Sequence, residues 1–320
     1  MNATLLTTAT LASVLAGMLP AKAADPLLLN LMMPDAKVLA GVNVDQAKNS
    51  TFGQYVLSQV QSQTTSGLQQ LTSLTGFDPT RDVHELLAAT NGGSNNHSGL
   101  VAATGTFDGG KFAALATLHG GKVETYGGAS ILEDPKQQYG VAFLSSTIVV
   151  AGDLANVKAA IDRQTTPQPL PKAIIDQVNK WSGTEDAWAI STVPPSSLNP
   201  GPGAIPIPGV GQQSGQNSAF QAIQSAGGGV KFGANVVVTA QVQADTAQNA
   251  TNLGDTLKLL ASMAQLQAKG DATVTALANS LNVSTSGTTL NVTVSLPQDM
   301  LQNLVKPHAA AVHRHPAEKK

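Results

Sequence analysis

Cysteine is absent from this chain of 320 residues, and charged residues are scarce. The missing thiols exclude disulfides, zinc–thiolate sites, iron–sulfur clusters and cysteine nucleophiles. Charged residues make up 12% of the chain, which is about half of the usual share. The net charge of −2 and the aromatic content of 4% argue against the basic blocks and stacking platforms of nucleic-acid-binding proteins. Neutral amides and hydroxyls therefore supply most of the polar surface.

The amino-terminal residues have the pattern of a secretory signal peptide, although no lysine or arginine precedes the apolar stretch. Residues 5–19 are apolar, too few for the roughly 20 that span a bilayer as a helix. Ala21-Lys22-Ala23 then gives a small-residue cleavage pattern. We therefore expect residues 1–24 to be a signal peptide, cut after Ala23 or Ala24. The mature protein would be periplasmic or secreted, without a transmembrane segment. A core helix at the amino terminus is the alternative interpretation.

Hydrophobic spacing predicts helices mixed with antiparallel strands. The longest alternation covers residues 230–244, where apolar and polar side chains follow one another in turn. This pattern predicts a strand with one buried face and one solvated face. Asp78-Pro79 predicts the start of a helix that points Val83, Leu86 and Leu87 inward. Further strands are expected at 38–44, 100–107, 123–126, 130–132, 139–144, 147–151, 187–193, 283–285 and 290–296. Further helices are expected at 52–60 and 68–74, after Asp108, Asp153, Asp245 and Asp271, at 174–181, and from Pro297.

One order of elements occurs twice along the chain: strand, helix, strand, helix, hairpin, helix. The first helix of each copy is expected to open at an aromatic residue, Phe52 or Phe220. The sequence therefore predicts an α+β fold of two similar units, each a mainly antiparallel sheet with helices packed on one face. The first unit spans residues 25–181, and the second spans 182–306. A Pro/Gly-rich loop at 194–216 interrupts the second unit, and residues 307–320 form a disordered tail with histidines and lysines. Convergence of simple patterns is the alternative to duplication.

Four motifs carry a resemblance to a known group of proteins: LTGFDPTRDV, which ends at Val83, GTFDGGKF at 105–112, YGGASIL at 126–132 and VAGDLANVKAAID at 150–162. In these motifs the chain resembles a family of uncharacterised exported proteins of soil acidobacteria. The resemblance covers most of residues 36–305 and consists of caps, turns and helix faces. It implies an exported protein of unknown function and transfers no catalytic residue. The Pro/Gly-rich run and the tail depart from it.

Few side chains stand out as catalytic candidates. His84-Glu85 lies in the expected helix, but Ala88 occupies the position of the second histidine of a zinc-protease motif. Glu124, Glu133 and Asp134 are close in sequence, and a glycosidase would need two carboxylates facing a cleft. We expect a solvated helix face and ordinary surface acids. Asp108, Asp153, Asp245 and Asp271 stand where helices begin, so helix capping accounts for them. Gly227-Gly228-Gly229 precedes an expected strand, not a helix, and therefore does not form a phosphate loop.

The tail contains the only candidates for metal ligation. His308, His313 and His315 lie among basic residues and could chelate a divalent metal weakly, although a plain solvated tail is the simpler interpretation. We expect no cofactor and no enzymatic activity. The leading hypothesis is a non-catalytic binding or structural module of the cell envelope, whose partner is an unidentified protein or envelope component and not a nucleic acid. The alternatives are a secreted hydrolase with an unrecognised active site and a carrier of a small apolar ligand.

Overall fold

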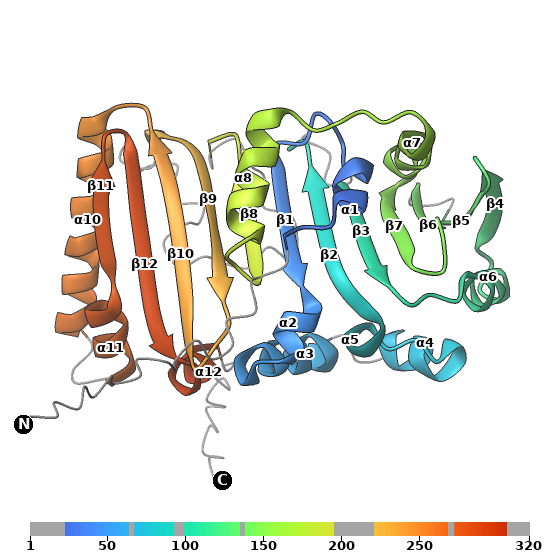
Figure 1. Ribbon diagram of the computed structural model, residues 1–320. Helices are drawn as coiled ribbons and strands as arrows, with labels where there is room; N and C mark the ends of the chain where they lie inside the picture. Colours follow the sequence, from blue (N-terminus) through green and yellow to red (C-terminus); the bar gives the residue numbers. More distant parts are fainter. Residues whose placement is uncertain are drawn as a thin grey trace, which may run out of the picture.

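A computed structural model describes residues 23–63, 67–92, 99–134, 138–194, 221–267 and 272–305. Within these residues the strands form one sheet of twelve strands, in the order β11-β12-β10-β9-β8-β1-β2-β3-β7-β6-β5-β4. The paired neighbours run antiparallel, as in β1 with β8 and β10 with β12. Figure 1 shows the sheet as one layer across the molecule, with helices beside it and beneath its lower end. The predicted α+β fold with an antiparallel sheet is confirmed, but the strands belong to one sheet and not to two.

The strands follow the chain in short segments separated by turns or helices. Their bounds are β1 (Val38–Asn43), β2 (Val83–Thr90), β3 (Gly99–Gly105), β4 (Lys122–Tyr126), β5 (Ala129–Asp134), β6 (Tyr139–Phe143), β7 (Ile148–Asp153), β8 (Ala187–Ser191), β9 (Ile223–Lys231), β10 (Asn235–Ala244), β11 (Asn282–Ser286) and β12 (Thr289–Pro297).

The helices vary from a single turn to more than five turns. Their bounds are α1 (Pro26–Leu31), α2 (Val44–Lys48), α3 (Thr51–Gln63), α4 (Gly67–Thr75), α5 (Pro79–Asp82), α6 (Gly109–Leu118), α7 (Leu154–Thr165), α8 (Lys172–Ser182), α10 (Ala247–Gln267), α11 (Ala272–Ser280) and α12 (Gln298–Val305). Among the described residues, none of the helices is both long and apolar enough to span a bilayer.

The strand order is the same on both sides of the central β1–β8 pair. In that pair Ala40 lies opposite Ala189. Outward from this pair, the strands of one side follow the order β1-β2-β3-β7-β6, and those of the other side follow β8-β9-β10-β12-β11. If β4 and β5 are set aside, the first, second, third, fifth and fourth strands of each side in the chain occupy the same places in the sheet. The first side continues into β5 and β4, the additional strand pair that the sequence predicts at 123–132. A duplication of the chain remains a prediction.

Three predicted elements are wrong. Phe220 lies outside the described residues, and the helix expected from it is contradicted because Ile223 begins strand β9. The helix expected after Asp78-Pro79 lasts only for α5, and Val83 begins strand β2, in which Val83, Glu85, Leu87 and Ala89 alternate as buried positions. Pairing with β1 on one side and β3 on the other outweighs the helix-like spacing. The single strand expected at 230–244 is a hairpin, because residues 232–234 separate β9 from β10 and Val230 pairs with Val238.

The largest core lies on one face of the sheet, which we name the α8 face. Helices α1 and α7 pack there against strands of the first side, and α8 packs against β8 and β9. Burying a large aliphatic side chain contributes about 1.5–3 kcal/mol, so this layer supplies most of the hydrophobic stabilisation. Its fully buried members include Leu28, Met32, Leu39, Leu87, Leu100, Ile131, Val150, Val157 and Val178.

The opposite face, which we name the α10 face, has its own smaller cores. Ala250 and Leu253 of α10 pack with Ile223, Ala244 and Leu290 over the second side of the sheet. At the lower end of the first side, α2 to α5 cover a cluster built on Val44, Val83, Ala103 and Phe107. Helices therefore lie on both faces of the sheet, not on one face as predicted.

Candidate functional site

Polar side chains replace the apolar core on the α8 face of β10, β12 and β11. Gln241 of β10 lies opposite Gly227 of β9, and an added Cβ at Gly227 would meet Trp181 of α8. Side chains directly opposite each other share a face, so Gln241 points toward α8. The residues that lie opposite Gln241 on the neighbouring strands, and those two positions away along each strand, point the same way. We name this group of side chains the polar sheet face. It comprises Thr239, Gln241, Gln243, Thr289, Asn291, Thr293, Asn282, Ser284 and Ser286, all uncharged.

A groove of about 280 Å³ lies where the polar sheet face meets α8. Gln177 forms one wall from α8, and Ser191 and Thr192 lie at the end of β8. Ser225 of β9 and the two glutamines of β10 complete the polar lining. Ile190 contributes an apolar patch to the same groove. The site therefore gathers amides and hydroxyls from four elements around one hollow.

A hydrogen-bond network orients the two glutamines. Lys180 Nζ donates to Gln241 Oε1 at 2.5 Å, and Gln241 Nε2 donates to Asn291 Oδ1 at 3.0 Å. Gln243 donates through Nε2 to the hydroxyl of Thr288, and its Oε1 accepts from Thr289 Oγ1 at 3.0 Å. A primary amide has two N–H donors and an oxygen that accepts twice. Each glutamine thus keeps hydrogen-bonding capacity in a fixed orientation.

The glycines of β9 let α8 lie directly on the sheet. A Cβ at Gly227 would be 2.5 Å from Trp181 Nε1, and a Cβ at Gly229 would be 2.5 Å from Glu185 Cγ. Burial raises the pKa of Glu185, which lies just after the end of α8. Gly227-Gly228-Gly229 lies within a strand and does not precede one, so the prediction of its place was wrong by a few residues. The glycines fix the position of the groove wall.

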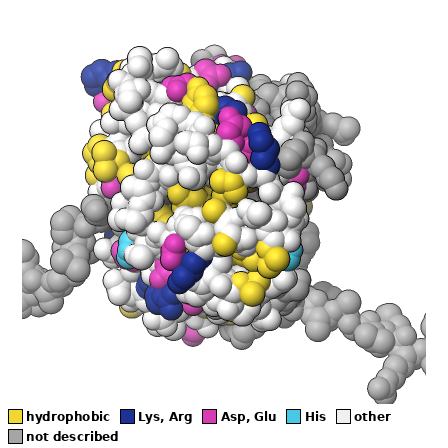
Figure 2. Space-filling view, turned by 90° about the vertical axis from the view of Figure 1, so that its right-hand side faces the viewer, with side chains coloured by type: hydrophobic (Ala, Val, Ile, Leu, Met, Phe, Trp, Pro, Cys, Tyr) yellow, Lys and Arg dark blue, Asp and Glu magenta, His cyan; other side chains and the backbone are white. Residues whose placement is uncertain are grey.

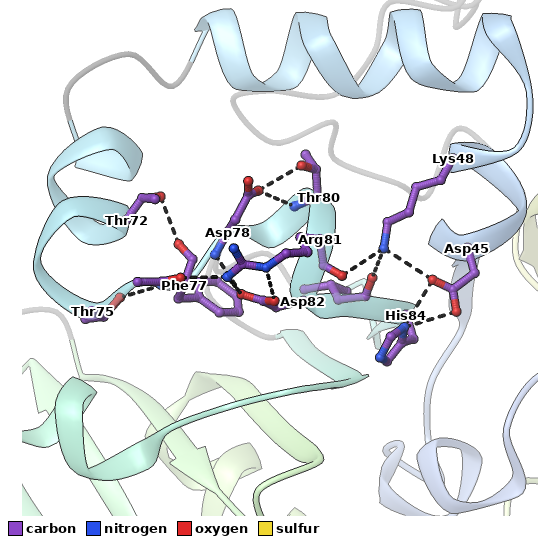
Figure 3. Close-up of polar contacts among 12 residues, drawn as sticks. Asp45, Lys48, Thr72, Thr75, Phe77, Asp78, Thr80, Arg81, Asp82 and His84 are labelled. Atoms are coloured by element: carbon purple, nitrogen blue, oxygen red, sulfur yellow. Dashed lines mark hydrogen bonds and ion pairs between the residues drawn. The ribbon is translucent and has the colours of Figure 1, made fainter.

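His84 is half-exposed on strand β2, outside any helix. Its Nδ1 lies 3.0 Å from Asp45 Oδ2, and Lys48 Nζ lies 3.2 Å from Asp45 Oδ1 (Figure 3). Burial opposes ionisation of Asp45, but the hydrogen bonds from His84 and Lys48 outweigh it and lower the pKa of Asp45. Lys48 also donates to the carbonyls of Arg81 and Val83. These contacts tie α2 to the start of β2, which is a structural role.

The loop between α4 and β2 is held by its own polar side chains. Asp78 Oδ1 caps α5 through the N–H of Thr80 at 2.9 Å. Arg81 donates to both carboxylate oxygens of Asp82 and to the carbonyl of Gly76, as Figure 3 shows for the residues that it labels. Because these donors and acceptors bond to one another, the cluster serves to fix the turn.

The structure brings Glu124 and Glu133 together and separates Asp134 from them. Lys122 lies opposite Glu133 in the β4–β5 ladder, and Lys158 of α7 reaches Glu124 at 2.9 Å. The Glu133 carboxyl, followed by Lys158, lowers the pKa of Glu124 to about 2. Asp134 is exposed, and as the next residue along the strand it points to the other face. Glu133 is 8% exposed, so it is not the surface acid that the sequence predicts. Lys122 and Lys158 hold the two carboxylates in ion pairs, which is a structural role.

Figure 2 views the molecule from its β4 side, where acidic and basic side chains lie next to one another. Lys122 has Glu124 and Glu133 at 3.4 Å, which is one such group on this edge of the sheet. Small mixed groups of this kind leave no broad field of one sign on the face that the figure shows. This face therefore offers no electrostatic platform for a highly charged partner.

Helix capping explains the aspartates at the helix starts that the structure describes. Asp108 accepts from the N–H of Lys111 at 3.2 Å, and Asp153 accepts from the N–H of Asn156 at 2.9 Å. At α10 the prediction is wrong by one residue. Thr246 Oγ1 accepts from the N–H of Asn249, whereas Asp245 accepts from the Asn249 side chain.

The histidines of the tail, His308, His313 and His315, lie outside the described residues, as do Asp271 and most of the loop at 194–216. In the part of the chain that the structure describes, no group of three or more histidines and carboxylates is arranged to hold a metal ion. The candidate metal ligands therefore remain a prediction from the sequence.

The groove was missed by sequence reasoning, although its components were visible. The alternation over 230–244 and in the hairpin near 290 indicates wet faces, and these faces are the polar sheet face. The sequence did not show that β10 and β12 are neighbours or that α8 lies over β9. Both facts depend on contacts between residues distant in the chain.

Comparison with known proteins identifies a fold but no family. No protein-family model matches the chain, and no curated protein matches it. Solved structures of TP0453 are similar. Crystal form III has a TM-score of 0.55 at 9% identity, covering 87% of this chain and 96% of that one. Crystal form I has a TM-score of 0.53, with the same identity and coverage. At this identity the likeness concerns the fold alone.

Proposed function

We propose that this protein is an exported, non-catalytic binding protein of the cell envelope that holds a neutral, hydroxyl-rich ligand such as an oligosaccharide. The observation that carries the proposal is the polar sheet face with its groove beside α8. The face presents oriented amides and hydroxyls where the rest of the α8 face presents an apolar core.

The absence of charge on these nine side chains argues for a neutral ligand. A charged ligand would lose hydration on this surface without an opposite charge to compensate. Lys180 reaches the face, but its ammonium bonds to Gln241 Oε1 and lies 4.8 Å from the Trp181 ring centroid. That ammonium orients the amide, and it is already engaged in these contacts.

The geometry of the face argues for an extended ligand with many hydroxyls. Neighbouring strands lie about 4.8 Å apart, so Gln241, Asn291 and Ser284 form a row of polar groups at regular spacing. Each amide offers donors and acceptors in one plane, which matches the mixed donor and acceptor character of a hydroxyl. The groove supplies an end wall, and the row leads from it to the sheet edge at β11.

Two finer features of the prediction belong to the same proposal. Export rests on the signal-peptide pattern at residues 1–24 and would place the protein in the periplasm or outside the cell. Duplication of one α+β unit is supported by the shared strand order on the two sides of the β1–β8 pair. If the halves arose by duplication, the second has become specialised for binding while the first keeps a covered core.

Binding of defined oligosaccharides tests the proposal. Calorimetric titrations would use neutral malto- and cello-oligosaccharides, with an anionic polysaccharide, alginate, as the comparison. We expect binding to a neutral glucan. We expect that replacing both glutamines, Gln241→Ala with Gln243→Ala, weakens binding by at least about tenfold, which corresponds to about 1.4 kcal/mol. The matched control is Gln248→Ala, an exposed glutamine of α10 on the other face, which should leave binding unchanged.

The same samples separate the other function classes. Release of reducing ends on prolonged incubation would indicate a secreted hydrolase. Uptake of an apolar dye in a one-to-one complex would indicate a carrier of small apolar ligands. Preference for alginate, or binding that survives the double substitution, would contradict the proposal.

A further inference from the structure

Asp25, the residue before helix α1, contacts a buried carboxylate. The backbone N–H of Asp25 donates to Glu85 Oε1 at 2.9 Å, across a separation of sixty residues in sequence. Glu85 is 8% exposed and lies on strand β2, where the next two buried positions, Leu87 and Ala89, belong to the core of the α8 face. The atom that Glu85 contacts belongs to the peptide bond between Ala24 and Asp25, one of the two predicted cleavage positions.

We propose that the chain is cut between Ala24 and Asp25 and that the new α-ammonium of Asp25 forms an ion pair with Glu85. Hydrolysis of this bond leaves the carboxylate on Ala24 and turns the Asp25 amide nitrogen into an ammonium. The nitrogen is already at hydrogen-bond distance from the carboxylate, so cleavage converts an amide–carboxylate contact into a charge-assisted one. The proposal rests on the proposed export, since a leader must be removed.

Helix α1 holds the nitrogen in place. The Asp25 side chain caps α1 by accepting from the N–H of Leu27 at 2.8 Å, and the Asp25 carbonyl accepts from the N–H of Leu29 at 3.1 Å. Leu28 and Leu31 of α1 are buried in the core of the α8 face. The amino terminus after cleavage is therefore positioned before the charge forms, which reduces the entropy lost on pairing.

The alternative cut, after Ala23, places the charge less favourably. Ala24 is 5% exposed and lines a hollow of about 410 Å³ with Leu29 and Ile175. An ammonium on this residue would lie beside these apolar side chains, one residue away from the nitrogen that Glu85 binds. Removing Ala24 deletes a single methyl group from the core, which is a small loss.

Two recombinant chains that differ by one residue test the ion pair without requiring export. Removable fusion partners would give chains 24–320 and 25–320, and thermal unfolding would be compared at pH 7. We expect the chain that begins at Asp25 to have a Tm higher by about 2–4 °C, the shift that about 1 kcal/mol gives in a large domain. Acetylating the Asp25 amino group should remove the gain without any substitution in the core.

Glu85→Gln keeps the shape of the side chain and removes its charge. When both chains carry Glu85→Gln, the chain that begins at Ala24 and the chain that begins at Asp25 should have the same Tm within error. A difference that persists in Glu85→Gln, or an equal Tm of the two chains with Glu85 intact, would overturn the ion pair. The acetylated chain decides the question if the substituted protein does not fold.

Amino-terminal sequencing of the exported full chain tests the cleavage position separately. We expect Asp25 as the first residue. Ala24 as the first residue would overturn the assignment of the bond. Intact Met1 on the recovered chain would refute the proposed removal of the leader, and with it the cleavage, whereas the thermal comparison would still decide whether Glu85 binds an ammonium at Asp25.

Discussion

The two sides of the sheet share a strand order but differ in what lies on their α8 face. On the first side, β3 and β7 present Leu100, Ala102 and Val150 to helices α1 and α7. On the second side, the counterpart strands β10 and β12 present glutamine, threonine and asparagine. The backbone arrangement is thus compatible with either a covered or a polar face. The side chains at alternate positions decide which one forms.

The largest effect is expected in the covered region. Leu100→Ala removes a side chain that is 1% exposed and should lower the free energy of unfolding by about 2–5 kcal/mol, through lost burial and the cavity left behind. Urea denaturation followed by circular dichroism would measure it. Leu118→Ala, at a leucine that is 76% exposed on α6, is the matched control and should change stability by less than about 0.5 kcal/mol. Equal effects would contradict the assignment of the core.

A reciprocal pair of substitutions compares the two regions directly. Val150→Thr places a hydroxyl in the apolar layer and should cost about 1–3 kcal/mol. Thr293→Val makes the opposite change on the half-buried polar sheet face and should alter the free energy of unfolding by no more than about 0.5 kcal/mol. The measurement is the same denaturation curve. A large loss from Thr293→Val would show that the polar sheet face carries stability instead of being kept for binding.

At β9, where the two regions meet, α8 lies so close to the strand that there is no room for a side chain at Gly227. Gly227→Ala would push a methyl group to 2.5 Å from Trp181 Nε1 and should destabilise the protein by about 1–3 kcal/mol through overpacking. Under the proposed function it should also weaken oligosaccharide binding, because α8 must move away from the groove. Gly110→Ala is the control, since the nearest atom to its added Cβ would be Asp108 Oδ1 at 3.5 Å. Full stability with Gly227→Ala would refute the close packing of α8.

The smallest effect is expected at the sheet edge beyond the covered region. Glu124 stays ionised down to about pH 2 in the folded protein, whereas its ordinary pKa is 4.5. Between these values the unfolded chain binds more protons, so the stabilisation from Glu124 is present above about pH 4.5 and is lost as the pH falls toward 2. Chemical denaturation at several pH values should show a shallower decline for Glu124→Gln. Glu133 and Lys158 remain in both proteins, and an unchanged slope would contradict the low pKa.

Local patterns predicted the elements in which sequence and tertiary context agree. β12 alternates over its whole length, and α7 has both an aspartate cap and a buried stripe of Val157, Ala160 and Ile161. Gly76 ends α4 with a φ of 76°, which glycine adopts without strain. These elements were located to within a few residues.

The failures occurred where distant partners outweigh local preference. In β2 the spacing of Val83, Leu86 and Leu87 fits a helix, but β1 and β3 pair with both sides of the segment. In β9 three successive glycines have little strand propensity, and the segment is a strand because β8 and β10 flank it. The groove depends on the same long-range pairings, so it could not be located from the sequence.

The β1–β8 pair also determines how the molecule could come apart. Residues 38–42 of β1 face residues 191–187 of β8 in an antiparallel ladder centred on Ala40 and Ala189. A chain cut between the halves would leave β1 with one unpaired edge, carrying the valines and alanines of that ladder. Because the ladder is antiparallel, two copies of such a half could pair through the same strand about a true two-fold axis. The ladder that joins the two sides into one sheet is thus also the edge that a separated half would expose.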